Sequence, residues 1–291
     1  MTRRLHVPKP PWLKVRLPRE ETFRDMRGLL RTGGLSTVCE EALCPNRAEC
    51  FQSGTATFLL LGNICSRNCR YCNVKHGTPR PLDDGEPKRV AAVAEKLRLR
   101  YVVLTSVTRD DLEDGGASHF ARCIAALRRR DSSRPVEVLV PDFRGSRQAL
   151  EVLARAEPDV VNHNLEVVKS LFTAVRPGGD YGRSIGLLEA MKKQYGQVTK
   201  SGIMVGLGER EEEIVELFDD LVAAGCDRLT IGQYQQPSRE HWPVQKYYHP
   251  DEFEGLRARA LERGLRYVNA GPLVRSSYRA AMMADMKERG T

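Results

Sequence analysis

The chain from Thr57 to Cys72 reads TFLLLGNICSRNCRYC, and this stretch decides the fold. Thr57 is followed by an unbroken apolar run at residues 58–61, typical of a strand that is covered on both faces of a parallel sheet. Cys65, Cys69 and Cys72 follow with the spacing C-x3-C-x2-C. Because α/β active sites form in the loops after the carboxyl ends of parallel strands, we expect this loop to carry the chemistry.

The same arrangement repeats along the chain, where short apolar runs alternate with amphipathic helices. Apolar residues recur with the helical period within residues 90–97, 120–127 and 214–222. Such alternation predicts a parallel sheet with right-handed crossovers. About six units fall short of the eight in a closed barrel, so we expect an α/β fold with a partial (β/α)6 TIM-type barrel. A doubly wound sheet is the competing architecture. The predicted strands are residues 57–61, 101–105, 137–140, 159–161, 202–205, 229–232 and 267–270.

Three parts of the chain are expected to have different tasks. Residues 1–55 form an N-terminal extension with its own cysteines, residues 56–270 form the barrel, and residues 271–291 form a short C-terminal segment. No apolar run approaches the ~18 residues that a membrane-spanning helix needs. The basic, proline-rich N-terminus lacks the apolar segment of a secretory signal. We therefore expect a cytoplasmic protein without a membrane partner, whose cysteines are thiols or metal ligands.

The net charge of +8 is concentrated at the two ends of the chain. Residues 1–31 contain nine basic and three acidic side chains, and residues 257–291 contain eight basic and three acidic ones. These ends are either solvated surface or a docking surface for an acidic partner. A basic motif interleaved with aromatic residues is missing, so nucleic acid is not the expected partner.

Six of the eight cysteines form two triplets. The first triplet (Cys39, Cys44 and Cys50) has the spacing C-x4-C-x5-C, and the second triplet is Cys65, Cys69 and Cys72. A structural zinc ion needs four ligands, whereas three thiolates on a cubane iron–sulfur cluster leave one iron open for another ligand. The triplets therefore favour iron–sulfur clusters, with a zinc site shared between them as the inorganic alternative. The remaining two, Cys123 and Cys226, lie in apolar surroundings and are expected in the core.

The second triplet, with Tyr71 before its last cysteine, resembles the signature of radical SAM enzymes. Further segments resemble lipoyl synthases, a family within that superfamily. The resemblance covers residues 39–278, with departures at Phe51, where tryptophan is usual, and Thr108, where aspartate is common. The segments that carry it are CEEALCPN at 39–46 with Glu49 and Cys50, DDL at 110–112, DGG at 114–116, NHNLE at 162–166, KSGIMVGLGE at 200–209, IGQY at 231–234 and RSSY at 275–278.

This resemblance implies a sulfurtransferase that uses two S-adenosyl-L-methionine (SAM) molecules per turnover. Hydrogen is removed from C6 and C8 of an N6-octanoyl-lysine, and an auxiliary [4Fe–4S] cluster supplies two sulfur atoms. A serine of the terminal motif would be the fourth ligand of that cluster: Ser277, with Ser276 as the alternative. Without the resemblance, these serines would be interpreted as a helix N-cap. The implied cysteine ligands are Cys39, Cys44 and Cys50 for the auxiliary cluster, and Cys65, Cys69 and Cys72 for the radical SAM [4Fe–4S] cluster.

Polar residues and glycines after the other predicted strands are further candidates for the site. The turn at residues 114–116 either approaches the methionyl end of SAM or is an ordinary turn. By strand alternation, His163 should point away from the barrel mouth and be structural. The resemblance implies SAM contacts by Tyr71, Asn73, Asp114, Gly115, Gly116, Asn164, Lys200, Glu209 and Gln233, and supporting roles for Arg275, Ser276 and Tyr278.

The resemblance also implies several protein partners. They are an octanoylated lipoyl carrier domain or H protein, an electron donor such as ferredoxin or flavodoxin, and an iron–sulfur carrier that rebuilds the auxiliary cluster. The basic ends of the chain would then steer the acidic carrier domain. The rival functions are a biotin-synthase-like sulfur insertion into a free small molecule, and a zinc-stabilised protein that binds nucleic acid.

Overall fold

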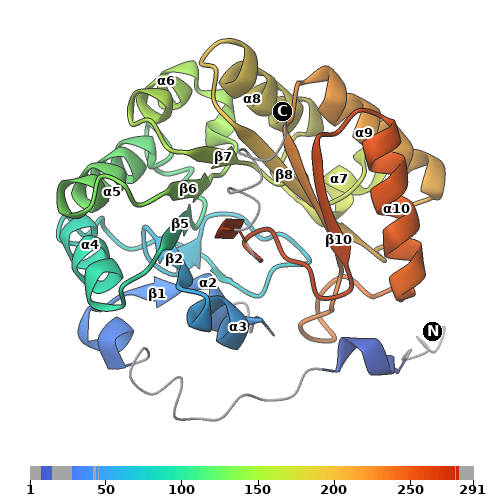
Figure 1. Cartoon of the computed structure of the whole chain (residues 1–291), viewed down its shortest axis with the longest axis horizontal. Coiled ribbons are helices and arrows are strands. Elements are labelled where there is room, and N and C mark those ends of the chain that lie inside the picture. Colours follow the sequence, from blue (N-terminus) through green and yellow to red (C-terminus); the bar gives the residue numbers. More distant parts are fainter. Residues whose placement is uncertain (1–7, 15–27, 42–43, 45, 279, 282–291) are drawn as a thin grey trace.

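An open, curved sheet of parallel strands forms the centre of the computed structural model, which describes residues 8–14, 28–41, 44, 46–278 and 280–281. Only the first strand is antiparallel to its neighbour. The two edge strands of the sheet do not pair with each other, so the barrel is partial (Figure 1), as predicted. In spatial order the strands are β1 (Ser36–Thr37), β2 (Thr55–Leu60), β5 (Tyr101–Ser106), β6 (Val136–Leu139), β7 (Val160–Asn162), β8 (Thr199–Val205), β9 (Arg228–Gln233) and β10 (Tyr267–Gly271).

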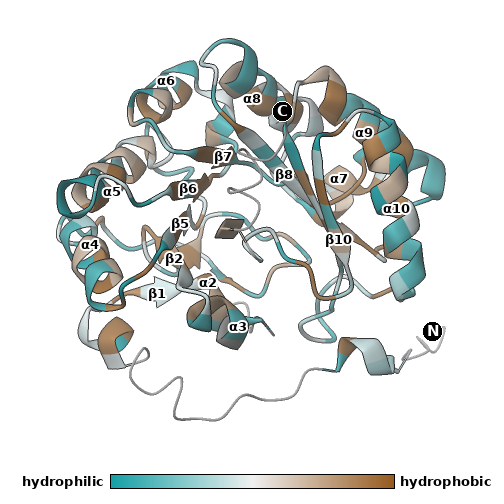
Figure 2. Ribbon diagram, viewed as in Figure 1, coloured by the Kyte–Doolittle hydropathy of each residue, from teal (hydrophilic) through white to brown (hydrophobic). Residues whose placement is uncertain are grey.

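Helices cover the outside of this arc (Figure 1). Six connections join the seven parallel strands, which agrees with the six predicted βα units. The apolar stripes of the helices face the strands and their polar faces point outward (Figure 2), because that arrangement buries the most apolar surface. The helices are α4 (Glu86–Lys96), α5 (Ala117–Arg130), α6 (Arg147–Arg155), α7 (Lys169–Val175), α8 (Tyr181–Lys193), α9 (Glu211–Ala223) and α10 (Pro250–Glu262).

Several short strands and helices lie outside the barrel framework, near the cysteines and in the loops. Two two-residue strands, β3 (Ile64–Cys65) and β4 (Lys75–His76), pair in parallel at the two ends of the cysteine loop, and β3 includes Cys65. The first triplet lies on and between α2 (Val38–Glu41) and α3 (Arg47–Gln52). Single 3-10 turns occur at η1 (Pro11–Leu13) and η2 (Phe143–Gly145).

A buried polar layer occupies the barrel interior toward the amino ends of the strands. The Lys200 ammonium group donates to both carboxylate oxygens of Glu137, at 2.9 and 3.3 Å. That carboxylate also accepts hydrogen bonds from the Tyr101 hydroxyl and the Asn162 amide. A buried ion pair is tolerated only when further hydrogen bonds satisfy its atoms, and this set supplies them. This layer is here called the floor, and the main open space of the barrel lies on the side of the carboxyl ends of the strands.

The N-terminal extension and the C-terminal segment meet at the open side of the barrel. The Asn46 amide donates to the Leu273 carbonyl at 2.5 Å. The Tyr278 hydroxyl donates to the carboxylate of Glu49, at 3.0 and 2.9 Å. In Figure 1 the end of the described chain lies inside the arc, and Ala280 packs against Tyr101 of the floor. Segments more than 200 residues apart in the sequence thus close the site together.

Some sequence predictions concern residues that the structure does not describe. Most basic residues of the two chain ends lie outside the described residues, as do residues 42, 43 and 45 of the first cysteine motif. No helix among the described residues has both the length and the apolar character that crossing a membrane requires.

Candidate active site

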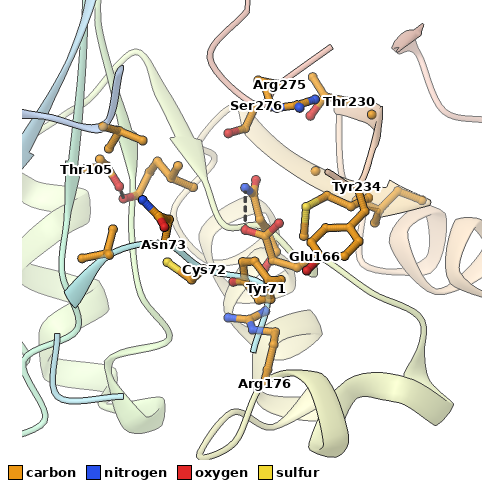
Figure 3. A pocket seen from close by; sticks show the side chains of 18 of the residues that line it. Tyr71, Cys72, Asn73, Thr105, Glu166, Arg176, Thr230, Tyr234, Arg275 and Ser276 are labelled. Carbon is orange, nitrogen blue, oxygen red and sulfur yellow. Dashed lines mark hydrogen bonds between the residues drawn. The ribbon is translucent and has the colours of Figure 1, made fainter. Parts of the chain in front are cut away.

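A cavity of about 490 Å³, here called the main cavity, lies inside the barrel at the carboxyl ends of the strands. Residues of the cysteine loop, of six parallel strands or the loops after them, and of the C-terminal segment line it. Figure 3 shows Arg275 and Ser276 across the cavity from Tyr71 and Arg176. The predicted site residues that line it are Tyr71, Cys72, Asn73, Asn164, Gln233, Arg275 and Ser276.

The second triplet surrounds a smaller cavity of about 130 Å³ beside the main one. Cys72 lines both, so the cysteine loop forms a wall of the main cavity. The Cys65 sulfur accepts hydrogen bonds from the backbone N–H groups of Arg67 and Thr108, at 3.4 and 3.3 Å. All eight cysteines are free thiols, so the donors needed by an iron–sulfur cluster are available here.

Burial controls the protonation of these thiols. It raises the pKa of Cys69, and it raises the pKa of Cys72 to about 12. Metal ligation requires thiolate, so an iron ion must displace the protons. Three thiols that line one cavity fit a cluster with one open corner, and the two N–H···S hydrogen bonds to Cys65 are of the kind that help to set cluster potentials.

Arg67 anchors the cysteine loop, a role that the sequence analysis missed. Its guanidinium group forms two hydrogen bonds to Asp110, at 2.7 and 2.8 Å, and two to Asp142, at 3.0 and 2.8 Å. Paired bonds of this kind fix orientation as well as distance. Ser66 adds two hydrogen bonds to the Thr108 carbonyl, both at 3.0 Å. These Thr108 contacts use only its backbone, so the departure from aspartate at this position leaves them unaffected.

The first triplet adjoins the main cavity from the N-terminal extension. Cys39 is buried and follows Val38, which lines the cavity. Burial raises the pKa of Cys39, and the nearby Cys44 and Cys50 raise it further. The backbone N–H of Cys44 donates to the Cys39 carbonyl at 3.1 Å. The loop therefore brings the three thiols of the first triplet close to one another.

The C-terminal motif lies between the first triplet and the cavity. Arg275 is half-buried, and desolvation lowers the pKa of its guanidinium group although the charges of Cys44 and Glu166 oppose the effect. Ser276 and Ser277 lie half-buried in the same turn, and only Ser276 belongs to the cavity lining. Tyr278 fixes the motif to the extension through Glu49. The structure thus brings the motif to the first triplet.

A buried charge cluster occupies the side of the cavity formed by the β7 loop. Burial raises the pKa of Glu166, against the opposing charge of Arg176 and a hydrogen bond of 3.0 Å from the Asn164 amide. Arg176 donates to the carbonyls of Asn164 and Leu165, at 2.8 and 3.0 Å. In sequence, Glu166 is visible only as part of the NHNLE motif, and nothing near Arg176, ten residues farther on, indicates its role.

His163 departs from its predicted orientation. It lines the main cavity together with Asn164, whereas strand alternation placed it on the opposite side. The reason is that β7 ends at Asn162, so the pleat no longer dictates the directions of the next side chains. His163 nevertheless has the structural contact that was expected, between its Nδ1 and the Val140 carbonyl at 2.8 Å.

Five predicted SAM contacts lie outside the lining of the main cavity. Asp114 accepts from the N–H groups of Gly116 and Ser118 at the start of α5, so residues 114–116 have the geometry of an ordinary capping turn. Gly116 has φ +95° and a Cβ there would lie 2.4 Å from Leu61, so only glycine fits. Lys200 belongs to the buried floor. Glu209 accepts from the N–H groups of residues 206, 207 and 208 and so shapes the loop after β8.

The arrangement of donors offers no support for the shared zinc site. Among the residues that the structure describes, no three His, Cys, Asp or Glu side chains converge on a position for a single metal ion. Cluster ligation makes no such demand, because each thiolate binds a different iron at its own corner.

Comparisons with known proteins agree with this geometry. The family model described as "Radical SAM superfamily" matches residues 59–233. The lipoyl synthases of Cronobacter sakazakii and Escherichia fergusonii are each 52% identical to the chain; the alignments cover 96% and 95% of this chain and 88% and 87% of those proteins. Streptococcus suis SuiB bound to the precursor peptide SuiA has a similar fold, with a TM-score of 0.58 at 13% identity over 92% of this chain and 58% of that longer chain. The chain belongs to the lipoyl synthase family of the radical SAM superfamily.

Proposed function

We propose that the chain inserts two sulfur atoms, at C6 and C8, into a protein-bound N6-octanoyl-lysine. Membership of the superfamily implies a [4Fe–4S] cluster and SAM. The observation that carries the proposal is the position of the main cavity between the two thiol triplets. Cys72 lines it on one side, and Val38 and Arg275, which adjoin the first triplet, line it on another.

The second triplet is proposed to hold the cluster at which SAM binds, and the first triplet the auxiliary cluster that supplies sulfur. When bound, the cluster at the second triplet would supply the electron that cleaves SAM. The fourth ligand of the auxiliary cluster is proposed to be Ser277, with Ser276 as the alternative. An alkoxide is a harder ligand than a thiolate and matches iron–sulfur clusters less well, which suits a cluster that must come apart.

The residues of the main cavity would bind and orient the reactants and exclude water. Of the nine predicted SAM contacts, we propose that Tyr71, Asn73, Asn164 and Gln233 touch SAM, because they line the cavity. The other five would act by shaping neighbouring loops or the floor. Glu166 and Arg176 add one acceptor group and one donor group to the same wall.

The partners follow from the proposed reaction. The octanoyl substrate reaches the enzyme on a lipoyl carrier domain or H protein, a one-electron donor such as ferredoxin or flavodoxin supplies electrons, and an iron–sulfur carrier rebuilds the auxiliary cluster. Two SAM molecules are consumed per turnover. We infer a cytoplasmic location, because eight reduced cysteines suit a reducing compartment.

Two cysteine variants test the division of labour between the triplets. Cys69→Ala should abolish both SAM cleavage and lipoyl product, whereas Cys44→Ala should retain SAM cleavage and lose sulfur insertion. Cys123→Ala is the matched control, because this thiol lies in the core on α5. The measurement is 5′-deoxyadenosine and lipoyl-lysine formed from an octanoylated carrier domain. Lipoyl product from Cys44→Ala would contradict the assignment of the first triplet.

A further inference from the structure

A second hollow lies on the outer side of the cysteine loop. This outer groove, of about 750 Å³, is formed by the loop at residues 68–76 and the segment at residues 240–243. Cys69 and Cys72 line the groove, and Cys72 also lines the main cavity. The cysteine loop therefore separates the interior, where the reactants bind, from a groove that opens to the surface.

The outer groove is held together by direct contacts with the cysteine loop. The backbone N–H of Trp242 donates to the Arg70 carbonyl at 2.8 Å, and His241 Nε2 lies 3.1 Å from the Cys72 carbonyl. The Trp242 indole donates to the Leu207 carbonyl at 2.8 Å, and the Arg70 guanidinium group lies 5.8 Å from the Trp242 ring centroid. The far wall of the groove is thus fixed relative to the second triplet.

The charge of the outer groove is positive. Arg70, Lys75 and His76 are exposed on the side of the cysteine loop, and Glu240 is the acidic residue in the lining. Neither Arg70 nor Lys75 forms an ion pair with another described residue. Exposed cations without an ion-pair partner are available to an acidic protein and accelerate its association.

We propose that the outer groove is the docking site of a small, acidic one-electron carrier protein. The inference rests on the proposed function, which requires an electron to reach a cluster at the second triplet. The docked carrier would lose one electron, and a cluster held by the second triplet would gain it. The octanoylated carrier domain is a poorer occupant, because its acyl chain must enter the main cavity on the other side of the cysteine loop.

Charge-reversal variants test this surface. They are the double variant Arg70→Glu with Lys75→Glu, the opposite change Glu240→Lys, and the control Lys96→Glu. Lys96 is exposed at the last turn of α4. A helix that connects two parallel strands ends near the amino ends of the strands, so Lys96 lies away from the cysteine loop. The measurements are the Kd of an acidic flavodoxin and the anaerobic rate of cluster reduction, by flavodoxin hydroquinone and by dithionite.

The double variant should weaken flavodoxin binding and slow flavodoxin-driven reduction by about tenfold or more at low ionic strength. Glu240→Lys should strengthen binding, Lys96→Glu should change neither quantity, and high salt should reduce the differences. Iron content and the rate with dithionite should stay at wild-type values in every variant.

Three results would overturn the inference. The first is unchanged flavodoxin kinetics in the double variant. The second is an equal slowing of reduction by dithionite, which would indicate a disturbed cysteine loop. The third is a variant that weakens binding of the octanoylated carrier domain and leaves flavodoxin binding unchanged. Each leaves the proposed function intact, provided that the enzyme still contains iron and cleaves SAM. A wild-type chain without iron would overturn the proposed function and this inference together.

Discussion

At the scale of single residues, Arg67 shows how the fold holds the second triplet in place. Its guanidinium group is 8% exposed and the Asp142 side chain is fully buried. Burial alone would raise the pKa of Asp142, but the hydrogen bonds and charge of Arg67 outweigh it and hold that pKa at about 2. Removal of Arg67 would leave a buried carboxylate whose remaining partners are the half-buried Arg183 and the backbone N–H of Arg144.

Arg67→Gln should therefore lower the free energy of unfolding by about 3–5 kcal/mol. The free energy of unfolding of Arg67→Lys should lie between those of Arg67→Gln and the wild type, since an ammonium group cannot make paired bonds to two carboxylates. Arg183→Gln is the control and should cost less, because it removes one hydrogen bond from Asp142. Chemical denaturation of the iron-free chains measures all three. Equal stabilities of Arg67→Gln and the wild type would contradict the anchoring role.

The same residue pair predicts a pH dependence. The pKa of Asp142 is lowered in the folded chain, so its contribution is complete above its ordinary pKa of 3.8 and is lost as the pH falls toward 2. Wild-type stability should thus decline across this window more steeply than that of Arg67→Gln. Unfolding free energies measured at pH 5, 4, 3 and 2.5 give the comparison. Parallel pH profiles of the wild type and Arg67→Gln would show that the titration of Asp142 does not depend on Arg67.

The two serines of the terminal motif differ in their positions and should differ in function. Ser276 lines the main cavity, whereas Ser277, in the same turn, does not. If Ser277 ligates the auxiliary cluster, Ser277→Ala should abolish sulfur insertion and retain SAM cleavage, while Ser276→Ala should retain both. Measurement of lipoyl product and of iron content distinguishes them. Loss of product only in Ser276→Ala would transfer the ligand role to that residue.

At the scale of elements, strands β6 and β8 share the buried pair of Glu137 and Lys200. The Lys200 side chain is fully buried and its hydrogen bonds go to Glu137, away from the cavity. This position explains why Lys200 belongs to a motif of the family without lining the site. In sequence, Lys200 begins a motif of the family and looks like a ligand, whereas its pairing with Glu137, 63 residues away, is visible only in the fold.

Lys200→Met should reduce stability by about 3–5 kcal/mol, because it leaves Glu137 buried without a counter-charge. The double variant Lys200→Met with Glu137→Gln should recover most of this loss, since the amide can still accept from Tyr101. SAM binding to the folded, iron-loaded protein should be unchanged in the double variant. Weak SAM binding with normal stability would instead make Lys200 a direct contact.

The elements themselves were predictable, and the reasons are local. Apolar runs of four or five residues fixed the strands, because these are covered on both faces, and the 3.6-residue period fixed the long helices. Local reasoning failed at His163, where the strand ends early. It also could not find Arg67 or Arg176, because their partners lie in other loops.

At the scale of the whole molecule, the two chain ends complete a barrel that six βα units leave open. Asn46 with Leu273 and Glu49 with Tyr278 join the extension to the C-terminal segment. The motifs assign the first triplet and the terminal serines to the same family, but their spacing in the sequence gives no physical reason why these two segments should lie close together. That reason is the missing part of the barrel wall, which both segments cover.

The central claim is that two separate clusters flank one cavity. Iron, acid-labile sulfide and zinc per chain, measured after anaerobic purification and reconstitution, test it most directly. We predict about eight irons with matching sulfide in the wild type, and about four when all three cysteines of either triplet are replaced by alanine. About four irons in the wild type would contradict the auxiliary cluster, and stoichiometric zinc without iron would contradict the whole account.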